Sequence, residues 1–433
     1  MNYYDLFQNQ VKQYPKKVFV IYNAASYTYQ QIDEKCREIR AGISNLNNQT
    51  VFISSGDWVF QLTAFLAVQA EAGIPILLHY PMAEDSIYSL ASKFQVNHLL
   101  TEEKICSLQL EVSVNFPHIC MGVLTSGTTG LSKIWYRTYS SWTDFFPVQN
   151  HIFNISKDTL LLLHGSLSFT GNLNAALSVL YAGGTLVTVD RFNPAKWDAD
   201  IAQFGISHLY FVPSKLQLIA SALQQEHPNI RQIFTGSQLL SSATIKKLKK
   251  LVPNAFIHLY YGSSELSFLT YIEANELLDK PFSVGKPFPG VKIFAEQDIL
   301  YVDTAYPVEG TDIPCPLQDH GYIDLDGHLI LQGRKDDMVN ISGYKVSIAH
   351  VERILLSMNG ISDAAVFAYT DANNKVKLVA VVVSQLNRME ILETLKAQLY
   401  YLEIPGKIIF MESIPYGPAG KPDYETLRRE VNV

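Results

Sequence analysis

The sequence predicts an α/β protein with a large N-terminal domain of α/β layers, a β-rich subdomain and a small α+β C-terminal domain. Short apolar stretches that are typical of strands alternate with amphipathic helical patterns through most of the chain. Between residues 283 and 333, proline, glycine and short strand signals become frequent, which indicates hairpins and turns. A compact β/α pattern follows, and its length of about one hundred residues suits a separate small domain.

The length of 433 residues also requires more than one domain, because a single hydrophobic core rarely grows past about 250–300 residues. We place the boundary at residue 336. Residues 1–335 then form the N-terminal domain, and residues 336–433 form the C-terminal domain.

Individual elements follow from the periodicity of the apolar residues. Residues 31–46 are expected to form a helix. Continuous apolar runs at residues 160–163, 185–189 and 209–212 predict buried, largely parallel strands. The pair Asp326 and Gly327 predicts a hairpin turn in the β-rich region.

The overall composition excludes several classes of protein. Hydrophobic residues make up 48% of the chain and charged residues 17%, which rules out disordered and fibrous proteins. The formal net charge is −7, whereas non-specific binding to nucleic acid or anionic lipid needs a basic surplus. We therefore expect no nucleic-acid partner.

The four cysteines are scattered without C-x-x-C spacing, so neither a zinc knuckle nor a disulfide framework is indicated, and a reducing compartment fits. The N-terminus lacks the basic and apolar regions of a signal peptide. No apolar stretch approaches the 18 or so residues that suggest a membrane helix. These features predict a cytoplasmic protein with no membrane span.

The histidines form no H-x-x-x-H or H-E-x-x-H pattern, and no G-x-S-x-G motif is present. Both observations weigh against a zinc hydrolase or a serine hydrolase.

A loop rich in hydroxyls and glycine, Leu124-Thr-Ser-Gly-Thr-Thr-Gly-Leu-Ser-Lys133, follows an apolar stretch. Glycines let backbone N–H groups approach anionic oxygens, while hydroxyls and the lysine add donors and positive charge, so the loop suits phosphates. A solvated linker is the alternative for this loop taken alone. A Walker A motif is excluded, because Lys133 is followed by Ile134 rather than by a hydroxyl residue.

With this loop, the sequence resembles the adenylate-forming enzymes, which include acyl-CoA synthetases, luciferases and the adenylation domains of peptide synthetases. Further matching segments occur in the order typical of that family. In chain order the segments are residues 125–133, 236–238, 260–265, 283–290, 319–321, 333–337, 343–346, 351–352 and 420–421. The sequence departs from the family pattern at Ser132, Ser264, Leu317 and Gln318. The resemblance spans nearly the whole chain.

The resemblance implies a role for each matching residue. The phosphate loop would comprise Thr125, Ser126, Gly127, Thr128, Thr129 and the catalytic Lys133. Adenine would lie against Gly236, Ser237, Gln238 and Tyr261, and the ribose would contact Asp319 and Arg334. Gly262, Ser263 and Ser264 would belong to the nucleotide-binding motif that includes Tyr261. The remaining roles would be the catalytic and metal-binding Glu265, the hinge Asp336 and the near-terminal catalytic Lys421.

The side-chain chemistry is compatible with these roles, and each residue also has a simpler interpretation. Glu265 offers the oxygen ligands that Mg²⁺ prefers, but it could instead act as a helix-cap partner. Asp319 can accept hydrogen bonds from ribose hydroxyls, or it can be structural. Tyr261 can stack on adenine or belong to the core. Lys421 lies in a loop rich in glycine and proline that cannot be helical and should be mobile.

The resemblance implies a two-step reaction. A carboxylate attacks the α-phosphate of ATP, which gives acyl-AMP and pyrophosphate, and a thiol then displaces AMP. The implied cofactors are ATP, Mg²⁺ and coenzyme A, and a mobile C-terminal domain would rotate about Asp336 between the steps. Alternatives are loading of a free-standing acyl or peptidyl carrier protein, or a non-catalytic nucleotide-binding regulator. Coenzyme A is favoured because no carrier domain follows Lys421.

The specificity segment is expected at residues 166–172, where family members that activate α-amino acids carry an aspartate. This stretch holds no acid and includes Phe169, the expected substrate contact. An ammonium group would be left without a charged partner there. The sequence therefore predicts a carboxylic acid without an α-amino group.

Overall fold

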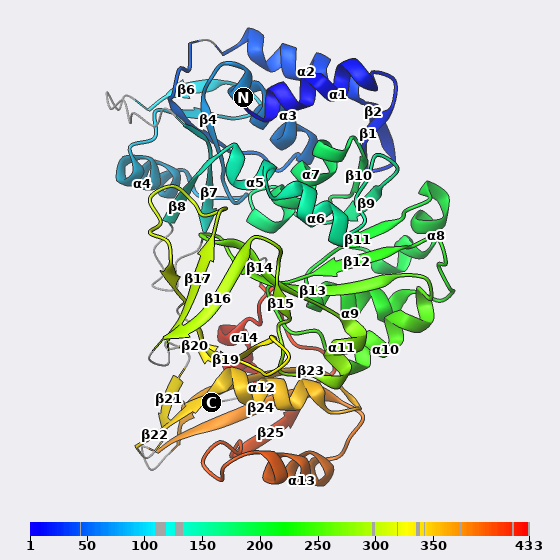
Figure 1. Ribbon diagram of the computed structural model, residues 1–433, viewed down its shortest axis with the longest axis vertical. Helices are drawn as coiled ribbons and strands as arrows, with labels where there is room; N and C mark the ends of the chain where they lie inside the picture. The colour runs from blue at the N-terminus through cyan, green and yellow to red at the C-terminus, as the bar shows by residue number, and fades with distance from the viewer. Residues whose placement is uncertain are drawn as a thin grey trace.

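The computed structural model describes residues 1–43, 45–108, 118–125, 133–296, 299–317, 319–334, 338–341, 343–371, 375–417 and 420–431, with only the backbone described at residues 332–334. The molecule is elongated (Figure 1). The N-terminus lies toward one end, and a C-terminal segment, residues 344–431, forms the other end. The α/β architecture predicted from the sequence is confirmed.

The central sheet has nine strands among the described residues, in the order β15-β14-β13-β12-β11-β9-β10-β1-β2. Its strands are β1 (Val18–Tyr22), β2 (Ala25–Thr28), β9 (Leu160–Leu163), β10 (Thr185–Thr188), β11 (His208–Tyr210), β12 (Gln232–Thr235), β13 (Phe256–Ser263), β14 (Ser267–Glu273) and β15 (Lys286–Pro287). The strands from β1 to β13 in this order run parallel, whereas β2, β14 and β15 pair antiparallel at the edges. The prediction of buried parallel strands is therefore correct.

Helices cover both faces of this sheet, and the side chains of β9 show why. Leu161 and Leu163 belong to one hydrophobic core and Leu162 to another, as expected when successive side chains point to opposite faces. The first core contains residues of α5 (Ser140–Thr143), α6 (Phe146–Ile152) and α7 (Thr170–Ala182). The second contains residues of α8 (Pro194–Phe204), α9 (Pro213–Ala222), α10 (Ser242–Leu251) and α11 (Ala274–Asp279).

A second sheet lies toward the N-terminal end, in the order β6-β5-β3-β4-β7-β8. Its strands are β3 (Thr50–Ile53), β4 (Ile74–Leu77), β5 (His98–Leu100), β6 (Ile105–Ser107), β7 (Ile119–Thr125) and β8 (Lys133–Thr138). The helices of this region are α1 (Tyr3–Gln13), α2 (Tyr29–Ala41), α3 (Trp58–Ala70) and α4 (Glu84–Phe94).

The helix expected at residues 31–46 is α2, and both of its ends differ from the prediction. The helix begins at Tyr29, because the Thr28 hydroxyl accepts a hydrogen bond from the Gln31 N–H in a capping box. It ends at Ala41, before Gly42, since glycine has a low helix propensity.

The β-rich region consists of short antiparallel sheets. Its strands are β16 (Val291–Glu296), β17 (Ile299–Thr304), β18 (Cys315–Pro316), β19 (Asp319–Ile323) and β20 (Leu329–Arg334). β19 and β20 form the expected hairpin, in which Gly327 adopts a φ of 84°. Glycine fits this left-handed conformation because it lacks a Cβ atom.

The C-terminal segment has its own hydrophobic core beneath a sheet in the order β23-β24-β25. Its elements are β22 (Tyr344–Ser347), α12 (Ile348–Ser357), β23 (Ile361–Thr370), β24 (Val376–Ser384), α13 (Arg388–Gln398), β25 (Lys407–Phe410) and α14 (Tyr424–Glu430). β22 pairs with β21 (Met338–Ile341). The domain boundary proposed at residue 336 falls outside the described residues and stays a prediction.

No helix in the described ranges combines the length and apolarity needed to cross a bilayer.

We predict that Phe153→Ala destabilises the N-terminal region strongly. The Phe153 ring is fully buried and stacks on Phe234 at a centroid distance of 4.7 Å. Removing a buried phenylalanine leaves a cavity that costs about 3–5 kcal/mol of unfolding free energy. Urea denaturation followed by tryptophan fluorescence measures the effect. The control Phe256→Ala, at a ring that is 54% exposed, should change the free energy by less than about 0.5 kcal/mol, and equal effects would contradict the prediction.

Candidate active site

Three loops meet at one edge of the central sheet because the strands that precede them are parallel neighbours. β11, β12 and β13 pair in register, with His208 opposite Gln232 and Gln232 opposite Phe256. Their carboxyl ends therefore lie together, which is where open α/β sheets bind ligands. The loop after β11 leads into α9, the loop after β12 contains Gly236, and β13 leads into a turn toward β14.

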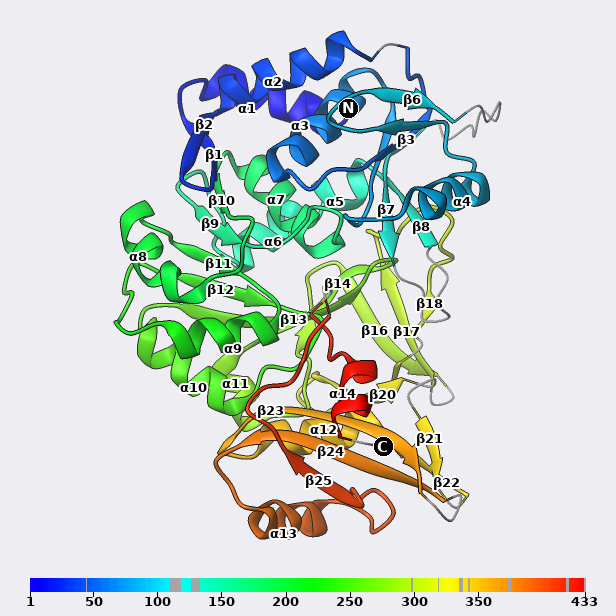
Figure 2. The ribbon, with the colours of Figure 1, turned by 180° about the vertical axis from the view of Figure 1, so that it is seen from behind.

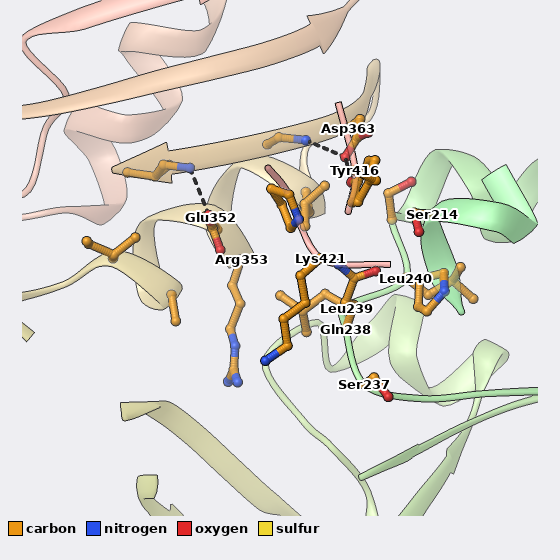
Figure 3. A pocket seen from close by; sticks show the side chains of 18 of the residues that line it. Ser214, Ser237, Gln238, Leu239, Leu240, Glu352, Arg353, Asp363, Tyr416 and Lys421 are labelled. Atoms are coloured by element: carbon orange, nitrogen blue, oxygen red, sulfur yellow. Dashed lines mark hydrogen bonds between the residues drawn. The ribbon is translucent and has the colours of Figure 1, made fainter. Parts of the chain in front are cut away.

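A cavity of about 670 Å³ lies between these loops and the C-terminal segment. From the loops and the β-rich region it is lined by Ser214, Ser237, Gln238, Tyr261, Gly262 and Asp319. From the C-terminal segment it is lined by Glu352, Arg353, Asp363, Tyr416 and Lys421. Its volume is within the range of ligand-binding pockets, which hold about 300–1,000 Å³. Figure 3 shows Lys421, Tyr416 and Gln238 among the side chains that surround this cavity.

The structure brings Tyr261 and Asp319 together at this cavity. The Tyr261 hydroxyl donates a hydrogen bond to an Asp319 carboxylate oxygen at 2.6 Å. Tyr261 is half-buried, whereas the preceding Tyr260 is buried and stacks on Phe268 at 4.0 Å. Successive residues of a strand point to opposite faces, so one tyrosine joins the core while the other can face a ligand.

The loop after β12 approaches Tyr260 closely. A Cβ atom at Gly236 would lie 2.5 Å from the Tyr260 ring, so only glycine fits there. The next residue, Ser237, adopts a φ of 72°, which is uncommon for a residue with a side chain. Ser237 and Gln238 then face the cavity.

The loop that carries Lys421 is closed at its base by backbone hydrogen bonds. The Asp423 N–H donates to the Pro415 carbonyl at 2.8 Å, and the Gly417 N–H donates to the Lys421 carbonyl at 2.9 Å. No described residue of this loop is helical, as predicted. The Lys421 side chain is exposed toward the cavity. In Figure 2 the chain after β25 runs up toward β13 before it enters α14.

Lys133 and Glu265 are not among the described residues that line the cavity. Lys133 begins β8, and its ammonium group lies 5.8 Å from the centre of the Trp135 ring. Glu265 lies half-buried in the turn between β13 and β14. The expected pairing of both residues with a ligand stays a prediction.

Several expected site residues lie at the limits of the described chain. Thr125 ends β7, while Ser126, Gly127, Thr128, Thr129 and Asp336 lie outside the described residues. The backbone of Arg334 pairs with Asp319 across the β19–β20 hairpin.

The two serines of the β13 turn have local partners. The Ser263 hydroxyl accepts a hydrogen bond from the Leu266 N–H at 3.3 Å. The Ser264 carbonyl accepts one from the guanidinium of Arg137. Arg137 is fully buried, and its hydrogen bond to the Ser264 carbonyl supports the turn from the interior of the protein.

Phe169 is the residue before α7, and its ring stacks on His79 at 4.8 Å rather than lining the cavity described above. Gly171 of the same segment lies closer to the cavity. A Cβ atom there would lie 2.1 Å from the Tyr210 hydroxyl, which is itself 2.8 Å from the Tyr260 hydroxyl.

Sequence reasoning did not identify Arg353, which lies on α12 and lines the cavity. Its guanidinium donates hydrogen bonds to the carbonyls of Leu331 and Phe282. Burial of the charged side chain lowers the pKa of Arg353 to about 10, and the charge of Asp319 opposes this effect. An arginine on the buried face of a helix, next to Val351 and Ile354, was the available signal.

The described residues that line the cavity fit a nucleotide. Asp319 and Tyr261 offer an acceptor and an aromatic face, and Lys421 supplies positive charge. Within the described part of the chain, no three His, Cys, Asp or Glu side chains cluster as a metal site. Glu265, the expected metal ligand, would supply a single carboxylate. Mg²⁺ is commonly held by one or two carboxylates together with substrate phosphates.

Comparisons with known proteins agree with this arrangement. The model of the family described as "AMP-binding enzyme" matches residues 111–298. An uncharacterized acyl-CoA ligase of Bacillus subtilis, YhfT, is 30% identical over 318 residues, which cover 69% of this chain and 65% of YhfT, just under two thirds of its length. The putative long chain fatty acid-CoA ligase VraA of Staphylococcus epidermidis is 25% identical over 96% of this chain and 95% of its own.

A similar solved structure is the o-succinylbenzoate CoA synthetase MenE of Bacillus subtilis in complex with the acyl-adenylate intermediate OSB-AMP. Its TM-score is 0.80 at 17% identity, and the alignment covers 98% of this chain and 97% of MenE. This likeness establishes the fold.

We predict that Tyr261→Phe weakens the binding of AMP. The substitution keeps the ring but removes the hydroxyl that holds Asp319, and a hydrogen bond to a charged group contributes about 1.5–3 kcal/mol. The dissociation constant, measured by isothermal titration calorimetry, should rise about tenfold. The control Tyr301→Phe lies on β17, outside the cavity lining, and should leave the constant unchanged. Equal constants for both variants and the unmodified protein would contradict the prediction.

Proposed function

We propose that the chain is a member of the AMP-binding family of adenylate-forming enzymes, and that it is an AMP-forming acid–thiol ligase of the acyl-CoA synthetase type. It activates a carboxylic acid with ATP and transfers the acyl group to coenzyme A. The observation that carries this proposal is the cavity at which Lys421 meets Asp319, Tyr261 and the Ser237–Gln238 loop. Positive side chains at a nucleotide-sized cavity, here Lys421, Arg353 and Arg428, suit chemistry at a phosphate.

In the first step, a carboxylate oxygen attacks the α-phosphorus of ATP. A new P–O bond forms, the bond to the bridging oxygen of pyrophosphate breaks, and pyrophosphate leaves with its electron pair. The difficulty is electrostatic, since two negatively charged groups must approach each other. Lys421 lowers this repulsion by placing an ammonium group beside the α-phosphate, and Lys133 does the same beside the departing phosphates.

The chain's other residues orient the nucleotide. Gly236, Ser237 and Gln238 lie against adenine with Tyr261, and the neighbouring Gly262, Ser263 and Ser264 continue this wall. Asp319 accepts hydrogen bonds from the ribose hydroxyls, with Arg334 as a donor. The phosphates bind to the hydroxyls and backbone N–H groups of residues 125–129. Glu265 would hold Mg²⁺, and that ion would supply charge neutralisation at the phosphates.

In the second step, the thiolate of coenzyme A attacks the acyl carbonyl carbon. A thioester bond forms, and the bond to AMP breaks. Residues 336–433 rotate about Asp336 between the steps, so that Lys421 leaves and the thiol can enter. We keep a cytoplasmic location as part of the proposal, because the scattered cysteines suit a reducing compartment.

The acid carries no α-amino group in this proposal. Residues 166–172 include no carboxylate that could pair with an ammonium. Phe169 contributes an aromatic ring to this segment, and Tyr210 packs closely against Gly171. An uncharged or aromatic-bearing acid avoids an unpaired buried charge.

We predict acid-dependent release of pyrophosphate from ATP. A panel of fatty, aryl and dicarboxylic acids should include active members, while standard amino acids should be inactive. Addition of coenzyme A should yield the acyl-CoA, detected by mass spectrometry. If a thioester forms only on an added carrier protein, that protein is the acceptor rather than coenzyme A. If the protein binds AMP but shows no turnover, it is a nucleotide-binding regulator instead.

We also predict that Lys421→Ala keeps nucleotide binding but loses acyl-AMP formation. One preorganised charge partner of a transition state contributes roughly a hundredfold or more in rate. Single-turnover formation of acyl-AMP measures the loss, and calorimetry with AMP measures the affinity. Adenylation at the rate of the unmodified protein would contradict the proposed role of Lys421.

A further inference from the structure

A partly buried hydrogen bond joins the loop that carries Lys421 to β23. The Tyr416 hydroxyl donates to an Asp363 carboxylate oxygen at 2.8 Å. Asp363 lies on β23 and is 7% exposed, while Tyr416 belongs to the loop that carries Lys421. Both residues line the cavity with Lys421 (Figure 3).

We propose that Asp363 and Tyr416 are positioning residues that set the place of the Lys421 ammonium group. The inference rests on the proposed function, since it requires Lys421 to act on the α-phosphate. Neither residue belongs to the segments in which the sequence resembles adenylate-forming enzymes.

The backbone of the loop couples Tyr416 to Lys421. Tyr416 forms an isolated antiparallel bridge with Pro422, the residue directly after Lys421. The Gly417 N–H, directly after Tyr416, donates to the Lys421 carbonyl at 2.9 Å. A shift of Tyr416 is therefore passed to Lys421 through the pairing of the two chain segments. The tyrosine ring acts as the link between the loop and the sheet.

The other side of the loop rests on the central sheet's loops. The Ser214 hydroxyl donates to the Gly420 carbonyl at 3.3 Å, and a Cβ atom at Gly420 would lie 2.7 Å from Val212. Residues Val212 and Ser214 stand at the start of α9. The loop is thus held between α9 and β23, and Asp363 provides the polar contact on the β23 side.

The chemistry of Asp363 argues against a role in stability alone. Burial raises its pKa to about 6, because the charged carboxylate loses its contact with water, and hydrogen bonds from Tyr416 and from the Ala364 N–H oppose the rise. A buried acid of this kind contributes little net stability compared with an apolar side chain of similar size. Asp363 instead fixes the position of the Tyr416 ring, because a hydrogen bond depends more strongly on distance and angle than apolar packing does.

The test is a mutant cycle between the positioning pair and the lysine. Tyr416→Phe removes the hydroxyl that donates the hydrogen bond, and Asp363→Asn removes the charge of the accepting carboxylate. Both substitutions change the side-chain volume little. Single-turnover acyl-AMP formation is measured for each variant alone and combined with Lys421→Ala, together with the dissociation constant for AMP. We expect each single substitution to slow adenylation about tenfold to a hundredfold, the scale of a small misplacement of a reacting group. The AMP affinity should stay unchanged.

In the Lys421→Ala background, neither substitution should slow adenylation further, because both act through the missing ammonium group. Tyr369→Phe makes the same chemical change on β23 at a residue outside the cavity lining, and it should leave the rate unchanged. Losses that multiply in the Lys421→Ala background would overturn the proposal, as would unchanged rates in the single variants.

Further outcomes separate this inference from the proposed function. If Asp363→Asn fails to fold by circular dichroism, Tyr416→Phe alone decides, since it keeps the packed ring. If the unmodified protein forms no acyl-AMP with any acid, both the proposed function and the positioning role are overturned. If it forms acyl-AMP and Tyr416→Phe matches its rate, only the positioning role is overturned.

Discussion

The parallel register of β11, β12 and β13 is the constraint on which the site depends. Parallel strands bring their carboxyl ends to one edge, so the loops at Ser214, Ser237 and Gly262 must lie together although they are far apart in the sequence. The register itself is set by apolar side chains buried on both faces, with Leu209 and Ile233 on one face and Tyr210 and Phe234 on the other. The core of the sheet therefore determines where polar loop residues can converge.

Hydrogen bonds link the C-terminal segment to the other residues around the cavity. Arg353 donates to backbone carbonyls of the preceding region, and Ser214 donates to the loop that carries Lys421. A loop closed at its base but seated through a few hydrogen bonds can deliver a lysine and later withdraw it.

The sequence alone predicted those parts of the fold and the site that depend on residues close together along the chain. The buried parallel strands, the turn at Gly327 and the residues Ser237, Gln238, Tyr261, Asp319 and Lys421, which meet at one cavity, could all be identified in advance. Arg353, Asp363 and Tyr416 could not, because their importance arises from partners that are distant along the chain. An aspartate in an apolar strand, such as Asp363 among Ala364 and Ala365, shows its partner only after folding. The end of α2 at Ala41 was missed because apolar periodicity continued past Gly42.

A crystal structure of the protein with AMP bound would test the central claim most directly. The account predicts the nucleotide in the cavity between the central sheet and the C-terminal segment. Its ribose should contact Asp319, its adenine should lie between Gln238 and Tyr261, and the Lys421 ammonium group should be within hydrogen-bond distance of the phosphate. Nucleotide bound at another place, or in this cavity with its phosphate pointing away from Lys421, would contradict the account.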